Sequence, residues 1–213
     1  MTEPTSTGGT IVVSGTGRVV VDPDIAELRL GVAVSRPTVE AARSAAAEAM
    51  TAILAAVTAA GVAKRDVRTM LLSVQPRYDY RDGKAPTLTG YDLANVVAVT
   101  VRDLARLGDV IDGALGAGAT SLDGLTFRVD DPRAAEHEAR TAAVAEARER
   151  AEVLAAAAGV AIAGVHDIVE TGAVPVWPQP KAARAMLASD AGTPVEGGTT
   201  EIAVTVSVTF HLG

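Results

Sequence analysis

The chain has 213 residues, of which 48% are hydrophobic and 21% are charged, a composition typical of a globular protein and not of a disordered one. Its net charge of −7, without a cluster of Lys and Arg, argues against a nucleic-acid partner, which needs a basic surface. It has no cysteine, which excludes disulfides, thiolate catalysis and cysteine-based zinc sites.

The first predicted elements are β-strands. Residues 11–21 are rich in valine and contain Gly15 and Gly17, and we expect two short β runs joined by a glycine turn. After Asp22-Pro23-Asp24, apolar residues from 26 to 34 alternate with polar ones, which predicts a half-buried strand.

A helix with strong 3.6-residue periodicity is predicted next. Ser35 or Thr38 can cap its first turn, and Gly61 stands where a residue with a positive φ ends many helices. Strand patterns follow at 67–79 and 90–102, and the turn residues between them predict an antiparallel hairpin.

A shorter helix at 104–116 and a strand at 122–129 precede a long helix at 132–157, which Asp130 or Asp131 caps, with Pro132 in its first turn. The long helix carries alanine at strict four-residue spacing, which lets it lie close to a sheet. A strand at 164–171 leads to a long proline-rich loop at 172–200. The last predicted strand, 201–212, alternates most clearly.

The predicted order is β-β-α-β-β-α-β-α-β-β. Alternation in most strands favours antiparallel sheets with one face covered by helices, so we expect an α+β fold with two long helices and one shorter one. No change of composition indicates a linker. We therefore expect a disordered tail at 1–9 and a single domain at 10–213.

The sequence contains no convincing catalytic or metal-binding motif. Gly-x-Gly-x-x-Gly, Walker and Gly-x-Ser-x-Gly sequences are absent. The three histidines, His137, His166 and His211, fall on different predicted elements. A metal site of His137 with Asp130 or Asp131 is the weaker interpretation, because acidic residues at a helix N-terminus are explained equally well by capping. We expect no enzyme activity, no cofactor and no bound metal.

Two apolar features are candidates for contact with another copy or another protein. One is the hairpin segment with Tyr78 and Tyr80, for which ordinary surface packing is the alternative. The other is the long loop with Trp177, Met186 and Leu187. Loops of this length are usually functional or disordered, although Trp177 could equally pack back onto its own sheet.

The polar N-terminus has no basic segment followed by an apolar run, and no stretch reaches 18 uninterrupted apolar residues. As written, the sequence therefore predicts a cytoplasmic protein without a membrane span. A chain from which a leader had been removed would look the same, and would be periplasmic or secreted.

Short segments in a consistent order resemble the SIMPL-domain family from about residue 10 to the end. They are Val13-Ser-Gly-Thr-Gly, Pro23-Asp24-Ile25-Ala26, Gly31-Val32, Pro76-Arg77-Tyr78-Asp79-Tyr80, Gly90-Tyr91 with Asn95, Val99-Thr-Val-Arg-Asp-Leu, Leu107-Gly, Gly116-Ala-Gly-Ala, Asp131-Pro132, Ala142 to Ala151, Thr193-Pro194-Val195 and Val204-Thr-Val-Ser-Val-Thr-Phe.

The resemblance implies an α+β fold with antiparallel sheet and no established catalytic residues. Some relatives assemble into ring- or channel-like oligomers. Bacterial members resemble a periplasmic immunogenic protein and a protein of oxidative-stress defence. Most of them carry a secretion signal or lipid anchor, and this sequence departs from them there.

Three functions follow as hypotheses. The first is an oligomerising interaction or scaffold protein, connected with stress tolerance. The second is a small-molecule binder or enzyme with a pocket between sheet and helices near Tyr78, Tyr80 and Tyr91. The third, an adaptor for a signalling enzyme, depends on the family name alone, which comes from an animal protein that binds a pelle-like kinase.

Overall fold

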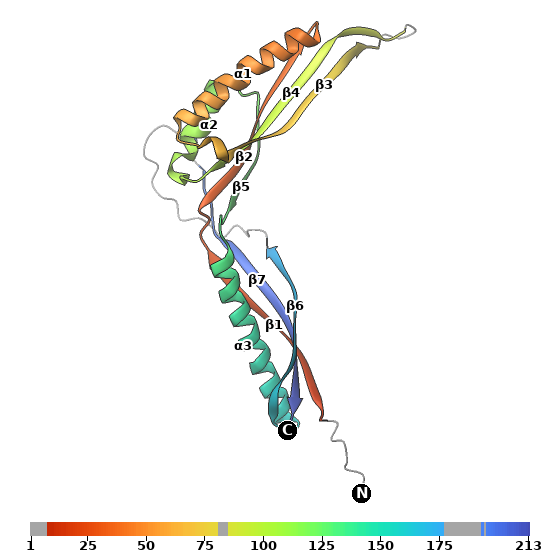
Figure 1. The fold of residues 1–213 in the computed structure, drawn as a ribbon, viewed down its shortest axis with the longest axis vertical. Helices are drawn as coiled ribbons and strands as arrows, with labels where there is room; N and C mark the ends of the chain where they lie inside the picture. The colour runs from red at the N-terminus through yellow and green to blue at the C-terminus, as the bar shows by residue number, and fades with distance from the viewer. Residues whose placement is uncertain (1–7, 81–84, 177–192, 194) are drawn as a thin grey trace. The chain divides into compact units, whose positions relative to one another are not determined.

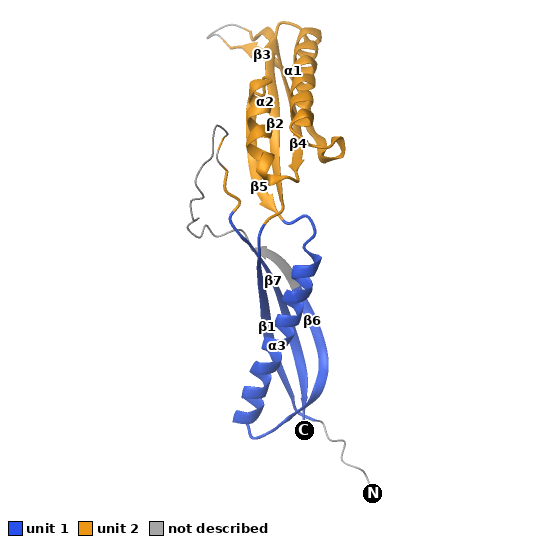
Figure 2. Ribbon diagram, turned by 90° about the vertical axis from the view of Figure 1, so that its left-hand side faces the viewer, with its two compact units in different colours: residues 1–22, 129–182, 198–213 blue, residues 23–128, 183–197 orange. Residues whose placement is uncertain are grey.

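A computed structural model describes residues 8–80, 85–176, 193 and 195–213 of the chain. The helices and strands follow the predicted order, with antiparallel pairing in both sheets, so the α+β prediction is confirmed (Figure 1). The chain divides into two compact units, drawn in blue and orange in Figure 2, and each has its own hydrophobic core. The expected single domain stays a prediction.

The first unit consists of residues 1–22, 129–182 and 198–213. Its sheet has the order β1-β7-β6, with β1 at Thr10–Val21, β7 at Thr200–Leu212 and β6 at Ile162–Val176. Helix α3, at Arg133–Ala157, packs mainly on β1 and β7. The buried side of β7 alternates as predicted, with Val204, Val206, Val208 and Phe210 facing the core.

The alanine row of α3 is buried against this sheet, which confirms the close packing that its spacing predicts: Ala135, Ala139, Ala143, Ala147, Ala151 and Ala155. The predicted glycine turn in residues 11–21 is wrong, because β1 runs through it without interruption. Gly15 and Gly17 lie where the helix backbone approaches the strand, so they serve the packing of α3 and not a change of chain direction.

The second unit consists of residues 23–128 and 183–197. Its sheet has the order β3-β4-β2-β5, formed by β2 (Ile25–Arg36), β3 (Val67–Asp79), β4 (Thr87–Val101) and β5 (Ser121–Arg128). Helices α1 (Val39–Ala59) and α2 (Leu107–Gly116) pack against one another on one side of it, and two short 3-10 turns lie at Lys64–Asp66 and Leu104–Arg106.

The core of the second unit is almost wholly aliphatic, as the low aromatic content predicts. It is built from Leu28 and Leu30 of β2, Ile53 and Val57 of α1, and Val99 of β4, all of them buried. Such a core depends on close fitting of branched side chains.

The helix ends agree with two predictions and shift a third. Thr38 caps α1, its Oγ1 accepting from the Ala41 N–H at 3.2 Å, and Gly61 has a φ of 97°. At α3 the N-cap residue is Pro132, and helical structure begins at Arg133. Asp131 still accepts the Arg133 N–H, at 3.2 Å, so it satisfies one free donor of the first turn from outside the N-cap position.

The loop expected at 172–200 begins later than predicted, because β6 continues to Val176 and pairs with β7 throughout. A proline at 175 is tolerated there since β6 is an edge strand, where one side of the backbone needs no partner. Three of the expected contact residues, Trp177, Met186 and Leu187, lie outside the described residues.

Candidate functional site

Strand β3 is an edge strand of the second unit, and it carries an unusual number of exposed apolar side chains. Leu72 is 66% exposed, and Tyr80, just beyond the strand, is 75% exposed. The other members of this surface, which we call the β3 surface, are Met70, Leu71, Val74 and Tyr78. An exposed apolar edge strand is a template on which a further strand can pair.

The β3 surface adjoins an open apolar groove. Helix α1 packs on β2 and β4, so the helix side of β3 stays largely uncovered. The space between the helix and the strand has a volume of about 780 Å³. It is lined by Leu54, Ala55, Thr58, Ala59, Lys64, Val67, Thr69 and Val97.

In contrast, the edge formed by β1 is shielded by side chains of α3. Glu146 Oε2 accepts the Thr16 N–H at 2.5 Å, and Arg150 Nη1 donates to the Ser14 carbonyl oxygen at 2.7 Å. Arg150 and Glu146 also pair with each other, at 2.6 Å. These bonds occupy main-chain groups that a further strand would need. Side chains thereby protect β1 against pairing.

The remaining two edges carry other features that discourage pairing. β6 shows three irregularities of register against β7, each of which disturbs a regular hydrogen-bond ladder. β5 has eight residues and an irregularity near Gly124, whose φ is 63°. β3 also contains irregularities, and Thr89 Oγ1 donates to the Arg77 carbonyl oxygen at 3.0 Å, beyond the segment from Thr69 to Gln75.

The two tyrosines proposed from the sequence lie close together at one end of β3. Their ring centroids are 6.3 Å apart, with the planes inclined at 58°. Both rings remain accessible to solvent, so Tyr78 and Tyr80 are available for contact, and their role as contact residues stays a prediction. They do not line the groove, so the structure does not bring them to the pocket that the second hypothesis expected there.

Sequence reasoning missed Met70, Leu71, Leu72 and Val74. Their run of apolar residues is visible in the sequence, but it reads equally well as a buried strand. Only the strand order places it at an edge. Met70, Leu71 and Leu72 follow one another without a polar residue between them. This break in the alternation is the one indication in the sequence that the strand differs from its neighbours.

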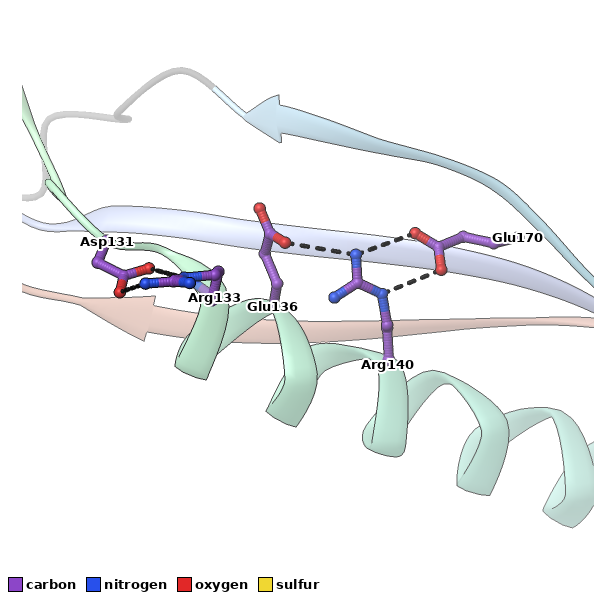
Figure 3. A network of polar contacts seen from close by, with 5 residues as sticks. All are labelled: Asp131, Arg133, Glu136, Arg140 and Glu170. Atoms are coloured by element: carbon purple, nitrogen blue, oxygen red, sulfur yellow. Dashed lines mark hydrogen bonds and ion pairs between the residues drawn. The ribbon is translucent and has the colours of Figure 1, made fainter.

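A group of charged side chains joins α3 to β6 in the first unit (Figure 3). Arg140 pairs with Glu136, one turn earlier, at 3.3 Å and with Glu170 of β6 at 3.0 Å. These carboxylates raise the pKa of the Arg140 guanidinium, the hydrogen bond with Glu170 being the largest cause. All three side chains are partly exposed, so the network orients β6 more than it stabilises the fold.

Asp131 and Arg133 form a second exposed pair at the start of α3 (Figure 3). The side-chain hydrogen bond from Arg133 lowers the pKa of Asp131 from 3.8 to about 2. A carboxylate so engaged does not favour the metal site considered for His137. Among the described residues, no group of three or more His, Cys, Asp or Glu side chains is placed to hold a metal ion.

The structure does bring together two histidines that the sequence leaves apart. His166 of β6 and His211 of β7 lie 3.1 Å apart, measured between Nδ1 and Nε2. His137 lies on α3. None of the described helices is long and apolar enough to cross a membrane.

Comparison with known proteins matches almost the whole chain to one family. The model of the SIMPL family, described as a protein of unknown function (DUF541), matches residues 11–210. The 26 kDa periplasmic immunogenic proteins of Brucella melitensis and Brucella abortus are each 37% identical over 211 residues, which is 95% of this chain and 84% of those proteins. The uncharacterized protein YggE of Escherichia coli K12 is 37% identical over 148 residues, covering 70% of this chain and 60% of YggE.

Proposed function

The chain belongs to the SIMPL family, a family of unknown function, and from this premise we propose that it acts as a self-associating interaction protein whose copies meet at the β3 surface. The observation that carries the proposal is the exposure of apolar side chains along β3, at the one sheet edge in the described chain where a long apolar run faces solvent. Removal of this surface from water is the expected driving force.

Association of like copies suits this surface better than capture of an unrelated chain. Two β3 strands can pair antiparallel about a two-fold axis, so that each copy presents the same apolar run to the other. The groove beside α1 enlarges the contact, because side chains of the second copy can enter its apolar space. Of the other edges, β6 exposes Val165, Ile168 and Val169, but among the residues whose side chains are described only β3 exposes three consecutive apolar residues, at 70–72.

The test is the solution mass, measured by light scattering after size exclusion, of the wild type and of a Leu72→Lys variant. A lysine at this position places a charge in the contact, so we expect the Leu72→Lys variant to have a lower mass than the wild-type multimer. Val153→Lys on α3 is the matched control, because Val153 is 65% exposed against 66% for Leu72. Its mass should equal that of the wild type.

A wild type that runs as a 21.6 kDa monomer at micromolar concentration would refute self-association. A multimer unaffected by Leu72→Lys would refute the β3 surface as the contact. In that second case, a variant with alanine at Trp177, Met186 and Leu187 tests the other contact predicted from the sequence.

The proposed cellular location is periplasmic, and it is based on the names of two relatives. Both Brucella relatives are named as periplasmic proteins, which supports a periplasmic location and gives no support to the cytoplasmic one expected from the sequence. A chain without cysteine folds independently of the redox state of that compartment. Fractionation of the native cells, followed by detection with an antibody, distinguishes the two locations.

A second function, binding of a small apolar molecule, is favoured by the groove itself. Its lining is apolar apart from Thr58, Thr69 and Lys64, which suits an amphiphile with an anionic end such as a fatty acid. Lys64 is the one charged residue among those that line it, which suits the anionic end of such a ligand. Titration with a fatty acid should show binding that Ala55→Trp abolishes by filling the space, while Val153→Lys leaves it unchanged.

A further inference from the structure

His166 and His211 hold their imidazole rings against each other on neighbouring strands of the first unit. His211 lies directly opposite Gly164, which has no side chain. The register shifts between Val165 and Asp167, so His166 is the additional residue of a bulge, and this brings its ring beside His211. The strand irregularity therefore aims a side chain at a specific position.

The two rings meet edge to face and not along an in-line N–H···N hydrogen bond. An in-line N–H···N bond of this length would separate the two ring centroids by about 5.5 Å, because each centroid lies roughly 1.2 Å behind its nitrogen. The measured separation of the centroids is 4.6 Å, and the planes are inclined at 64°. Both rings are therefore tilted, so that their centroids lie off the extension of the line from His166 Nδ1 to His211 Nε2.

Coordination of one cation by both rings accounts for these values. With a metal–nitrogen distance of about 2.0–2.1 Å, two ligand nitrogens lie about 2.9 Å apart at a right angle and about 3.3 Å apart in a tetrahedron. The two centroids are then about 4.5 to 5.2 Å apart. The observed 3.1 Å between Nδ1 and Nε2, with 4.6 Å between centroids, falls inside both ranges.

We propose that His166 and His211 form a two-histidine chelate for a divalent transition-metal cation, with His166 Nδ1 and His211 Nε2 as the ligands. Neutral imidazole is a preferred ligand of Cu²⁺ and Zn²⁺, and Cu²⁺ is bound more tightly in most such sites. Both side chains are exposed, so a cation reaches them directly from solvent.

The chain supplies two ligands only. Since no third His, Cys, Asp or Glu completes the group among the described residues, water fills the other positions of the cation. The affinity of such a site comes from the fixed spacing of the two rings, because the second nitrogen binds as part of the same molecule. The site lies in the first unit and is independent of the β3 surface.

The test is a calorimetric titration of the full chain with Cu²⁺ and, separately, with Zn²⁺. We expect one cation per chain, with the affinity reduced roughly tenfold or more by either His166→Ala or His211→Ala, because each leaves a single imidazole. His137→Ala is the matched control, since it removes the only other histidine. It should bind as the wild type does.

A second readout identifies the ligand atoms. In nitrogen-15 spectra of the Zn²⁺-bound protein, we expect the resonances of His166 Nδ1 and His211 Nε2 to shift, while the remaining ring nitrogens carry the protons. Unchanged thermal unfolding of the two alanine variants shows that they remain folded. Equal affinity of all four proteins, an equal loss in His137→Ala, or no binding by the wild type at millimolar cation would overturn the proposal.

Discussion

Gly17 of β1 lies so close to Ala139 of α3 that a Cβ on the glycine would stand 1.9 Å from the alanine carbonyl oxygen. Gly15 stands in the same relation to Ala143, at 2.0 Å from its carbonyl oxygen. The two glycines and the alanine row of the helix are thus two halves of one contact. Neither glycine can accept a side chain without displacement of a backbone.

We predict that Gly17→Ala destabilises the first unit by about 3 kcal/mol or more, because the added methyl group meets main-chain atoms that cannot rotate away. Unfolding in urea, followed by circular dichroism, measures the change. Gly164→Ala in β6 is the control, since a Cβ there meets nothing within 4 Å. Equal unfolding midpoints for the two variants would contradict this account of the packing.

The sequence predicts a helix or strand correctly wherever the pattern depends only on residues within that element. Alternation along β7 and the alanine spacing of α3 predict both elements, because each period reports one buried face. The turn predicted at Gly15 and Gly17 is wrong because the need for these glycines arises from a contact distant in the sequence. A Gly-Thr-Gly segment is typical of a turn, and only its contact with a helix more than a hundred residues later explains why glycine is needed.

The candidate site depends almost entirely on non-local order. The apolar run from Met70 to Val74 becomes an exposed surface because β3 stands at the edge of its sheet. The residues of the run do not themselves indicate the order of the strands. His166 and His211 are 45 residues apart, and a bulge decides that they meet. Tyr78 and Tyr80 were identifiable because they are two of only three tyrosines.

Replacement of both Glu146 and Arg150 by alanine should expose the edge of β1. The Thr16 N–H and the Ser14 carbonyl oxygen lose their side-chain partners, and an unprotected edge invites pairing with another chain. We expect faster aggregation on heating, recorded by light scattering at a fixed protein concentration.

The matched control for this change is the double variant Arg148→Ala, Glu152→Ala. That pair lies on the same helix with the same four-residue spacing, at 2.9 Å, and both of its side chains are more than half exposed. Its aggregation rate should stay at the wild-type value. If the two double variants aggregate alike, loss of surface charge and not exposure of β1 is the cause.

Arg140 should govern the local stability of β6. Its guanidinium bridges α3 and Glu170, and α3 otherwise packs mainly on β1 and β7. We predict that Arg140→Ala accelerates hydrogen exchange of amides near Glu170, with a change in global stability below about 1 kcal/mol because the pair is exposed. Arg148→Ala, which removes a pair within α3, should leave the exchange in β6 unchanged; equal acceleration in both would contradict the bridging role.

Asp131 should titrate far below an ordinary aspartate. The hydrogen bonds from the Arg133 side chain and N–H favour the carboxylate and lower the pKa from 3.8 to about 2. Because the folded pKa is the lower one, the contribution of this pair to stability is present above pH 3.8 and is lost as the pH falls through about 2.

Carbon-13 spectra of the Asp131 carboxyl group should therefore show its midpoint near 2 in the wild type. In Arg133→Met the midpoint should rise toward 3.8 without reaching it, since the N–H remains, while Arg148→Met should not move it. An unchanged midpoint in Arg133→Met would show that the guanidinium is not the cause.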